Sequence, residues 1–139
     1  MSNTATSTHT GTVAELYGAF GRGDIPFILD RMTDDISWEK GLRRTELPWF
    51  QERSNKQQVA QFFQDLGQGI ELSTFEPQMI LGDGNKVVAV IRIAGSIVST
   101  GKPVEEDLWV HVWTFDADGK VEAFRHIGDL AREEIPFKS

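Results

Sequence analysis

The feature that most constrains this fold is a series of strand-like segments that fills residues 70–128. β-Branched and aromatic residues dominate these segments, and turn signals rich in Gly, Asp and Pro separate them at 82–85, 100–103 and 116–119. Strands that are joined by such short turns run antiparallel. Gly95 interrupts the longest segment and predicts a bulge or bend there. The sequence therefore predicts a mostly antiparallel sheet that curls at one point.

Three helical patterns precede these strands, at residues 12–22, 24–33 and 54–66. In the first of them, four apolar side chains share one face: Val13, Leu16, Tyr17 and Phe20. A short alternating strand at 36–39 lies between the second and third helices. The order α-α-β-α-β-β-β-β indicates an α+β fold, with three N-terminal helices packed on a curved sheet. A curled sheet that helices close on one side encloses an apolar pocket in a cone, and such pockets bind small ligands.

The chain of 139 residues is long enough for one domain but not for two. Residues 1–11 are polar and rich in Ser and Thr, so we expect a disordered tail, and we give its His9 no catalytic role. The folded cone is expected over residues 12–131, followed by a short C-terminal tail at 132–139. Residues 40–53 show no regular period and predict an irregular loop that carries aromatic side chains.

Composition excludes several classes of function. The chain has 14 Lys and Arg against 21 Asp and Glu, a formal net charge of −7, and no basic cluster. This argues against nucleic acid and against anionic membrane surfaces as partners. The absence of cysteine excludes thiol catalysis and thiolate metal sites. No apolar run approaches the roughly 18–20 residues of a membrane span, so we expect a cytoplasmic protein.

Two histidines are the main candidates for chemistry. Strand alternation places Trp109, His111 and Trp113 on one face, and it places His126 on the same face as Phe124 in the next strand. Imidazole titrates near neutral pH, so two such rings in one apolar cavity can act as a general acid and base. The alternative is two buried histidines whose nitrogens are satisfied by neighbouring groups.

Other side chains can shape a ligand site. Tyr17 is either a core aromatic or a hydroxyl donor aimed at a substrate oxygen. Lys40 is expected to point inward at the cavity mouth and Asp129 to lie near that mouth, whereas regular alternation turns Glu39 outward unless a bulge reverses it. Four aromatic residues are expected to line the ligand cavity: Trp38, Phe63, Trp109 and Trp113.

A metal site would need a third ligand beside the two histidines. Glu39 or Asp129 could supply one, but the spacing matches no known metal signature. We therefore expect neither a metal nor any other cofactor.

Five stretches of the sequence carry a resemblance to known proteins. They read VAELYGAFGRGD at 13–24, MTDDISW at 32–38, VHVWTF at 110–115, DGKV at 118–121 and FRHIGD at 124–129. Together they resemble the nuclear-transport-factor-2-like superfamily, most closely its SnoaL-like (polyketide cyclase-like) and ketosteroid-isomerase-like branch. The resemblance implies a cone with its cavity between the first helix and the concave face of the sheet.

The resemblance also suggests roles for individual positions. Tyr17 matches the oxyanion-hole tyrosine of the ketosteroid isomerases, whereas their general-base aspartate falls at Lys40 and their protonated aspartate at His111. Isoleucines stand where the family's epoxide hydrolases carry Arg and Asp on the long middle strand, and the acidic partner of that pair falls at His126. A histidine pair with a nearby tyrosine resembles the arrangement in scytalone dehydratases.

These observations predict a cofactor-free enzyme that acts on a small, apolar, oxygen-bearing molecule. Isomerase, dehydratase or cyclase chemistry would pass protons through His111 and His126, while Tyr17 polarises a carbonyl or hydroxyl group. The alternative is a protein of the same fold that binds a small ligand without transforming it. The resemblance further implies a homodimer through the outer sheet face, whose apolar positions are Val88, Val90, Val110 and Val112.

Overall fold

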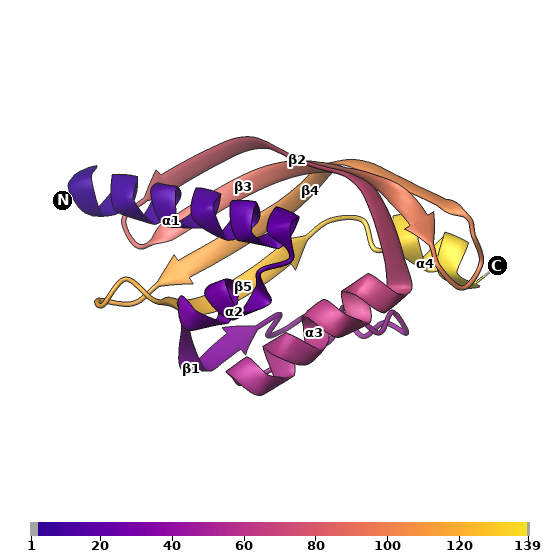
Figure 1. Cartoon of the computed structure of the whole chain (residues 1–139), viewed down its shortest axis with the longest axis horizontal. Coiled ribbons are helices and arrows are strands. Elements are labelled where there is room, and N and C mark those ends of the chain that lie inside the picture. Colours follow the sequence, from indigo (N-terminus) through magenta and orange to yellow (C-terminus); the bar gives the residue numbers. More distant parts are fainter. Residues whose placement is uncertain (1–2, 139) are drawn as a thin grey trace.

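The computed structural model describes residues 3–138, which form three helices and five strands in the predicted order, followed by a fourth helix at the C-terminal end (Figure 1). The elements are α1 (Asn3–Arg22), α2 (Ile25–Asp30), β1 (Met32–Trp38), α3 (Lys56–Gly69), β2 (Ile70–Asp83), β3 (Lys86–Ile97), β4 (Pro103–Phe115), β5 (Val121–Ile127) and α4 (Ala131–Lys138). None of these helices is long and apolar enough to cross a membrane.

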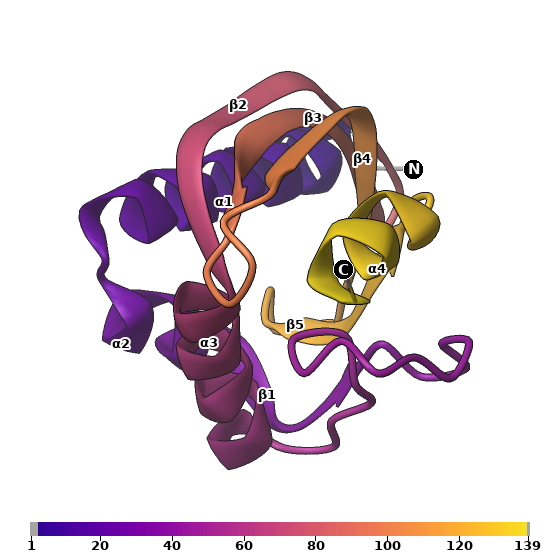
Figure 2. The ribbon, with the colours of Figure 1, turned by 90° about the vertical axis from the view of Figure 1, so that its right-hand side faces the viewer.

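All five strands form one mixed sheet in the order β1-β5-β4-β3-β2. β1 pairs with β5 in parallel, and every other neighbouring pair is antiparallel. The sheet does not close into a barrel. Instead β2, β3 and β4 form an arch with α1 beneath it, and α3 lies on the far side of the molecule from the top of this arch (Figure 2). This arrangement confirms the predicted α+β fold of helices on a curved, mostly antiparallel sheet.

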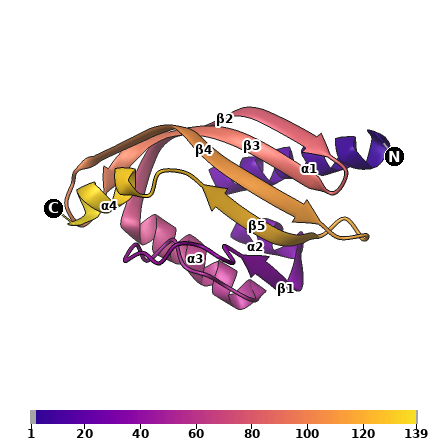
Figure 3. The ribbon, with the colours of Figure 1, turned by 180° about the vertical axis from the view of Figure 1, so that it is seen from behind.

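The predicted irregularity at Gly95 is confirmed, and its cause is a close approach between strands. Gly95 pairs with Leu72 on β2 and with Val104 on β4, and the β2 register slips between Leu72 and Thr74. A Cβ atom at Gly95 would lie 2.2 Å from the carbonyl oxygen of Glu71, so only glycine fits there. Figure 3 shows that β2, β3 and β4 bend together toward the C-terminal end of the molecule.

The helix boundaries follow their capping residues. Asp24 accepts a hydrogen bond from the Phe27 N–H and begins α2, as predicted. Asn55 begins α3 by accepting from the Gln58 N–H, and the Gln58 side chain accepts in return from the Ser54 N–H. The second helix ends at Asp30, three residues earlier than predicted, because the chain then pairs with β5 as a strand.

The prediction of a disordered N-terminal tail is wrong for residues 3–11, which extend α1 back to Asn3; residues 1 and 2 lie outside the described part. The His9 ring stacks on Phe115 with centroids 4.3 Å apart and planes 3° apart. The His9 Nδ1 atom also lies 3.3 Å from the carbonyl oxygen of Gly84. Polar composition alone suggested disorder, but packing of His9 against the end of β4 and the β2–β3 turn supports the helix.

The C-terminal residues and the 40–53 loop pack together rather than extending into solvent. The Trp49 indole is fully buried, donates a hydrogen bond of 3.0 Å to Glu133 on α4, and packs edge-on against Phe137. Glu134 accepts hydrogen bonds from Arg43 and Thr45 of the loop. Residues 132–138 are therefore part of the folded unit rather than a separate tail, while residue 139 lies outside the described part.

Candidate active site

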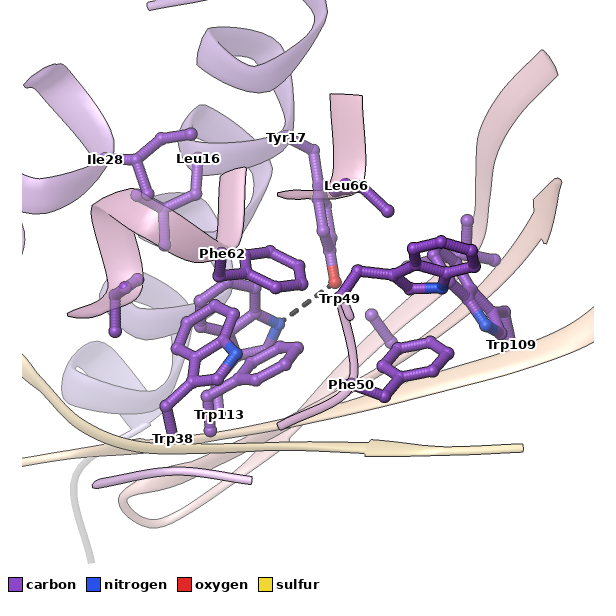
Figure 4. Close-up of a cluster of buried hydrophobic side chains, with 14 of the residues drawn as sticks. Leu16, Tyr17, Ile28, Trp38, Trp49, Phe50, Phe62, Leu66, Trp109 and Trp113 are labelled. Atoms are coloured by element: carbon purple, nitrogen blue, oxygen red, sulfur yellow. Dashed lines mark hydrogen bonds between the residues drawn. The ribbon is translucent and has the colours of Figure 1, made fainter. Parts of the chain in front are cut away.

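Helices α1, α2 and α3, the 40–53 loop and the concave face of the sheet enclose a cavity of about 50 Å³. Figure 4 shows aromatic side chains from the helices, the loop and the strands converging on this space. The four aromatic residues predicted to line the cavity do so: Trp38, Phe63, Trp109 and Trp113. Beside Tyr17, the polar side chains in the wall are Glu39, His111 and His126. A small set of polar groups in an apolar enclosure is typical of ligand sites.

The two candidate histidines lie opposite each other on neighbouring strands. His111 on β4 pairs in register with His126 on β5, so alternation turns both rings to the concave face. Their ring centroids are 6.0 Å apart at an interplanar angle of 66°. Both side chains are buried, with 8% and 3% of their surface exposed. The structure thus brings the predicted pair to one cavity.

A hydrogen-bonded chain joins α1 to the sheet across the cavity. The Trp113 indole N–H donates to the Tyr17 hydroxyl over 3.0 Å, and that hydroxyl lies 2.9 Å from Nδ1 of His111. Two proton arrangements satisfy this geometry. If Tyr17 donates to His111, the imidazole carries its proton on Nε2. If His111 donates to Tyr17, the phenolic O–H is free to donate to another group. Either way, the Tyr17–His111 pair retains one N–H or O–H donor for a ligand oxygen.

Burial sets the charge of these groups. Desolvation, helped by the nearby His126, holds the pKa of His111 well below its ordinary value. Desolvation and the charge of Arg125 lower the pKa of His126 to about 3. Burial raises the pKa of Tyr17, although the bond from Trp113 opposes that shift. At neutral pH both imidazoles are therefore uncharged, and the phenol keeps its proton.

Glu39 is the functional candidate that the sequence analysis placed outside the cavity. It has φ 61°, a left-handed conformation that is uncommon for a residue other than glycine. Directly after β1, this conformation reverses the alternation and turns the carboxyl inward, so that Glu39 is 0% exposed. The sequence signals a break only through the glycine at position 41, which gives no direction for the Glu39 side chain.

Burial and two neighbouring groups set the pKa of Glu39. Its Oε1 atom accepts a hydrogen bond of 2.7 Å from the His126 backbone N–H and lies 3.7 Å from Nε of Arg125. Burial nevertheless dominates and raises the pKa of Glu39 to about 7. A carboxyl group that titrates near neutral pH is suited to act as a general base or acid.

Two residues that were expected at the cavity mouth do not line the cavity. The Lys40 side chain is exposed rather than turned inward, because Glu39 occupies the inward position. Asp129 is exposed and accepts a hydrogen bond from the Ala131 N–H at the start of α4. Neither residue lines the cavity, so the prediction that Lys40 points inward is wrong, and Asp129 has a capping role.

His126 is held in place by contacts that the sequence did not indicate. The Phe50 ring from the 40–53 loop stacks on the imidazole with centroids 4.4 Å apart and planes 9° apart. Directly after β5, a Cβ atom at Gly128 would lie 3.1 Å from Nε2 of His126, so the glycine leaves room for the ring. The loop thereby fixes the orientation of a cavity side chain.

Several buried polar atoms around the cavity have no hydrogen-bond partner among the described residues. They include Nε1 of Trp38, Oε2 of Glu39 and both ring nitrogens of His126. Buried polar groups are ordinarily satisfied, so such atoms in a cavity wall point to a polar ligand or water. Within residues 3–138 there is no group of three His, Asp or Glu side chains that could hold a metal ion.

A sheet curled around helices, with titratable side chains in the wall of an aromatic cavity, defines the class of cone-shaped α+β proteins. The chain belongs to the SnoaL-like family, because the family model of the SnoaL-like domain matches residues 13–124. A comparison with curated proteins found no match.

Solved structures share this fold. A nuclear-transport-factor-2-like protein of unknown function from Burkholderia pseudomallei is 24% identical, with a TM-score of 0.82 over 100% of both chains. One from Burkholderia xenovorans is 28% identical, with a TM-score of 0.79 over 93% of this chain and 97% of that one. TerC, crystallised with polyporic acid, is 21% identical, with a TM-score of 0.74 over 94% and 98% of the two chains.

Proposed function

We propose that the protein is a cofactor-free enzyme that transfers protons on a small, apolar molecule bearing a carbonyl or hydroxyl oxygen. Isomerisation, dehydration and cyclisation are reactions of this kind. The observation that carries the proposal is a single cavity in which a buried carboxyl of near-neutral pKa, Glu39, lies with two uncharged imidazoles, His111 and His126.

The proposed roles differ from those expected from the sequence. An imidazole whose pKa is far below neutral is a weak base, so Glu39 rather than a histidine removes the proton from carbon. The donor of the Tyr17–His111 pair hydrogen-bonds the substrate oxygen and stabilises the enolate that forms. Glu39 then returns the proton to another carbon, or the neutral His126 passes it on. The apolar wall excludes water during this transfer.

Deuterium exchange into simple carbonyl compounds tests this proposal. Small ketones and cyclic enones are incubated with the protein in D₂O, and NMR measures deuterium at the carbon next to the carbonyl. Replacing Glu39 by Gln should slow the exchange at least roughly 10²-fold. Glu105→Gln, an exposed carboxyl on the outer side of β4, is the matched control. Equal exchange rates in the Glu39→Gln variant and the wild type would rule out Glu39 as the base.

The second candidate is a binding protein of the same fold. The largely aromatic wall favours it, because flat ligands bind to such walls without any proton transfer. Polyporic acid, the ligand present in the TerC crystal, is a suitable probe. Quenching of tryptophan fluorescence by this compound, with no ketone or enone exchanging deuterium above background, would favour binding alone.

A further inference from the structure

The cavity around His111 and His126 is too small, as it stands, to admit a substrate. Its volume is about 50 Å³, whereas an engineered cavity of about 150 Å³ in another protein holds benzene. One part of the wall must therefore move before even a single six-membered ring can enter.

A much larger groove lies next to the cavity, separated from it by part of the cavity wall. It is a groove of about 720 Å³ between α1 and β2, and none of its lining side chains is charged. On the α1 side it is lined by small residues: Ala14, Gly18 and Gly21. Three rings line both the groove and the cavity and form the partition between them: Tyr17, Phe20 and Phe75.

Two of these three rings are restrained by their positions. Tyr17 is held by its hydrogen bonds with Trp113 and His111, and moving it would break both. Phe20 lies on α1 and packs against Phe63 of α3 as well as Phe75, so its movement would disturb the contact between two helices.

Displacement of the Phe75 ring breaks the fewest restraining interactions of the three. Phe75 lies on β2, the edge strand, which pairs only with β3. The register slips on both sides of it, between Leu72 and Thr74 and between Pro77 and Met79. Its half-buried ring packs against the apolar core, including the rings of Tyr17, Phe20 and Trp109, and moving it breaks no hydrogen bond.

We propose that Phe75 is the gate of the cavity and that the substrate is an elongated molecule, with a planar oxygen-bearing head and an unbranched apolar chain. The head replaces the Phe75 ring beside Tyr17 and Trp109, and the chain lies in the uncharged groove between α1 and β2. The identity of the oxygen-bearing head rests on the proposed function. The position of the substrate's alkyl chain rests only on the groove and on the three rings that separate it from the cavity.

Phenyl alkyl ketones, from acetophenone to octanophenone, are the probes for this proposal. Their binding is followed by the fluorescence of the cavity tryptophans. In the wild type, the affinity should rise about two- to fourfold for each methylene that enters the groove. Replacing Phe75 by Ala should raise the association rate of each ketone at least about tenfold, because the gate is then absent. An unchanged association rate would show that Phe75 is not the gate.

A matched pair of glycine variants on α1 tests whether the alkyl chain of the substrate lies in the groove. Gly18 lines the groove, and a Cβ there would meet only the mobile end of Arg22 at 3.5 Å, so Gly18→Leu should fold and fill the groove. Gly11 lies on the same helix outside the groove and has no atom within 4 Å of its Cβ position. Gly18→Leu should abolish the dependence on chain length but leave acetophenone binding within about twofold, whereas Gly11→Leu should change neither.

Each outcome bears on one of the two proposals. Chain-length dependence that persists in Gly18→Leu would overturn the path through the groove even if the protein exchanges deuterium. Absence of binding by every ketone in both the wild type and Phe75→Ala would overturn it as well. Dependence on chain length that Gly18→Leu removes, without any deuterium exchange, would support the gate and groove while contradicting the proposed enzyme.

Discussion

At the scale of single residues, one backbone angle decides whether Glu39 or Lys40 points into the cavity. The left-handed conformation of Glu39 turns its carboxyl inward beside His126 and leaves Lys40 exposed. Because the pKa of Glu39 lies near 7 and that of His126 near 3, Glu39 holds a proton between these two values whereas His126 does not, and above pH 7 only Glu39 is charged. Pairs of groups whose pKa values are pushed apart in this way mark the base and the neutral partner of a proton-transfer site.

The pH dependence of exchange follows from Glu39. A general base works in its ionised form, so the rate of deuterium exchange should rise as the pH increases through about 7 and then level off. The measurement is the exchange rate between pH 5 and 9 under conditions in which the protein stays folded. A rate that is independent of pH across this range would mean that another group is the base.

Removal of the Tyr17 hydroxyl tests the hydrogen-bonded chain. In Tyr17→Phe, the buried Trp113 N–H loses its acceptor and His111 loses its partner. We expect the free energy of unfolding to fall by about 1–3 kcal/mol, the cost of leaving a buried polar group unsatisfied. Urea denaturation measures this change, and Phe27→Leu, on a half-exposed ring outside the cavity, serves as a comparison. A change below about 0.5 kcal/mol in Tyr17→Phe would contradict the assigned hydrogen bonds.

At the scale of elements, the end of α3 supports the loop that holds His126. Gly69 is the last residue of α3, and a Cβ atom there would lie 2.1 Å from the Trp49 ring. Trp49 is next to Phe50, the residue that stacks on His126. A helix end, a loop and a cavity side chain are thus joined by direct packing.

Two alanine substitutions in α3 separate this packing from helix propensity. Gly69→Ala should destabilise the protein by about 1–3 kcal/mol, because the new methyl group displaces the buried Trp49 ring. Gly67→Ala meets no atom within 4 Å and should be neutral or stabilise by up to about 1 kcal/mol. Thermal or urea unfolding measures both effects. Equal stability of the two variants would show that the Trp49 contact does not constrain the helix end.

At the scale of the whole molecule, the convex face of the sheet carries a cross-strand row of apolar side chains. Val90 pairs with Met79 on one side and Val110 on the other, and Val110 pairs in turn with Ile127. Met79 and Ile127 are 51% and 52% exposed. An apolar row of this kind on a sheet face suits a symmetric contact with a second copy of the chain, as the sequence analysis expects.

A lysine in this row tests the homodimer. The wild type should elute with twice the mass of the chain in size-exclusion chromatography with light scattering, and Val90→Lys should elute as a monomer, because a dimer would bury the new charge. Val98→Lys, at a 54% exposed valine away from this row, should leave the dimer intact. A monomeric wild type at about 100 μM would contradict the proposed contact.

Local patterns in the sequence determined most of the elements and part of the site. Period-two alternation placed Trp109, His111 and Trp113 on one face, and His126 on the same face as Phe124 in the next strand. The register that sets His126 opposite His111 includes a shift after Thr114 and was visible only in the structure. Turn residues located the ends of the strands, and cap residues located the starts of α2 and α3. These features depend on neighbours in the chain, so the sequence alone carries them.

Only the tertiary structure decided the rest of the site. Glu39 turns inward because the chain leaves β1 through a left-handed residue, while Phe50 reaches His126 because α3 and α4 hold the 40–53 loop against the sheet. The His9 ring on α1 likewise stacks on Phe115 at the end of β4. Each of these outcomes depends on partners that are distant in the sequence. Burial by those partners also sets the pKa of Glu39, which no local pattern encodes.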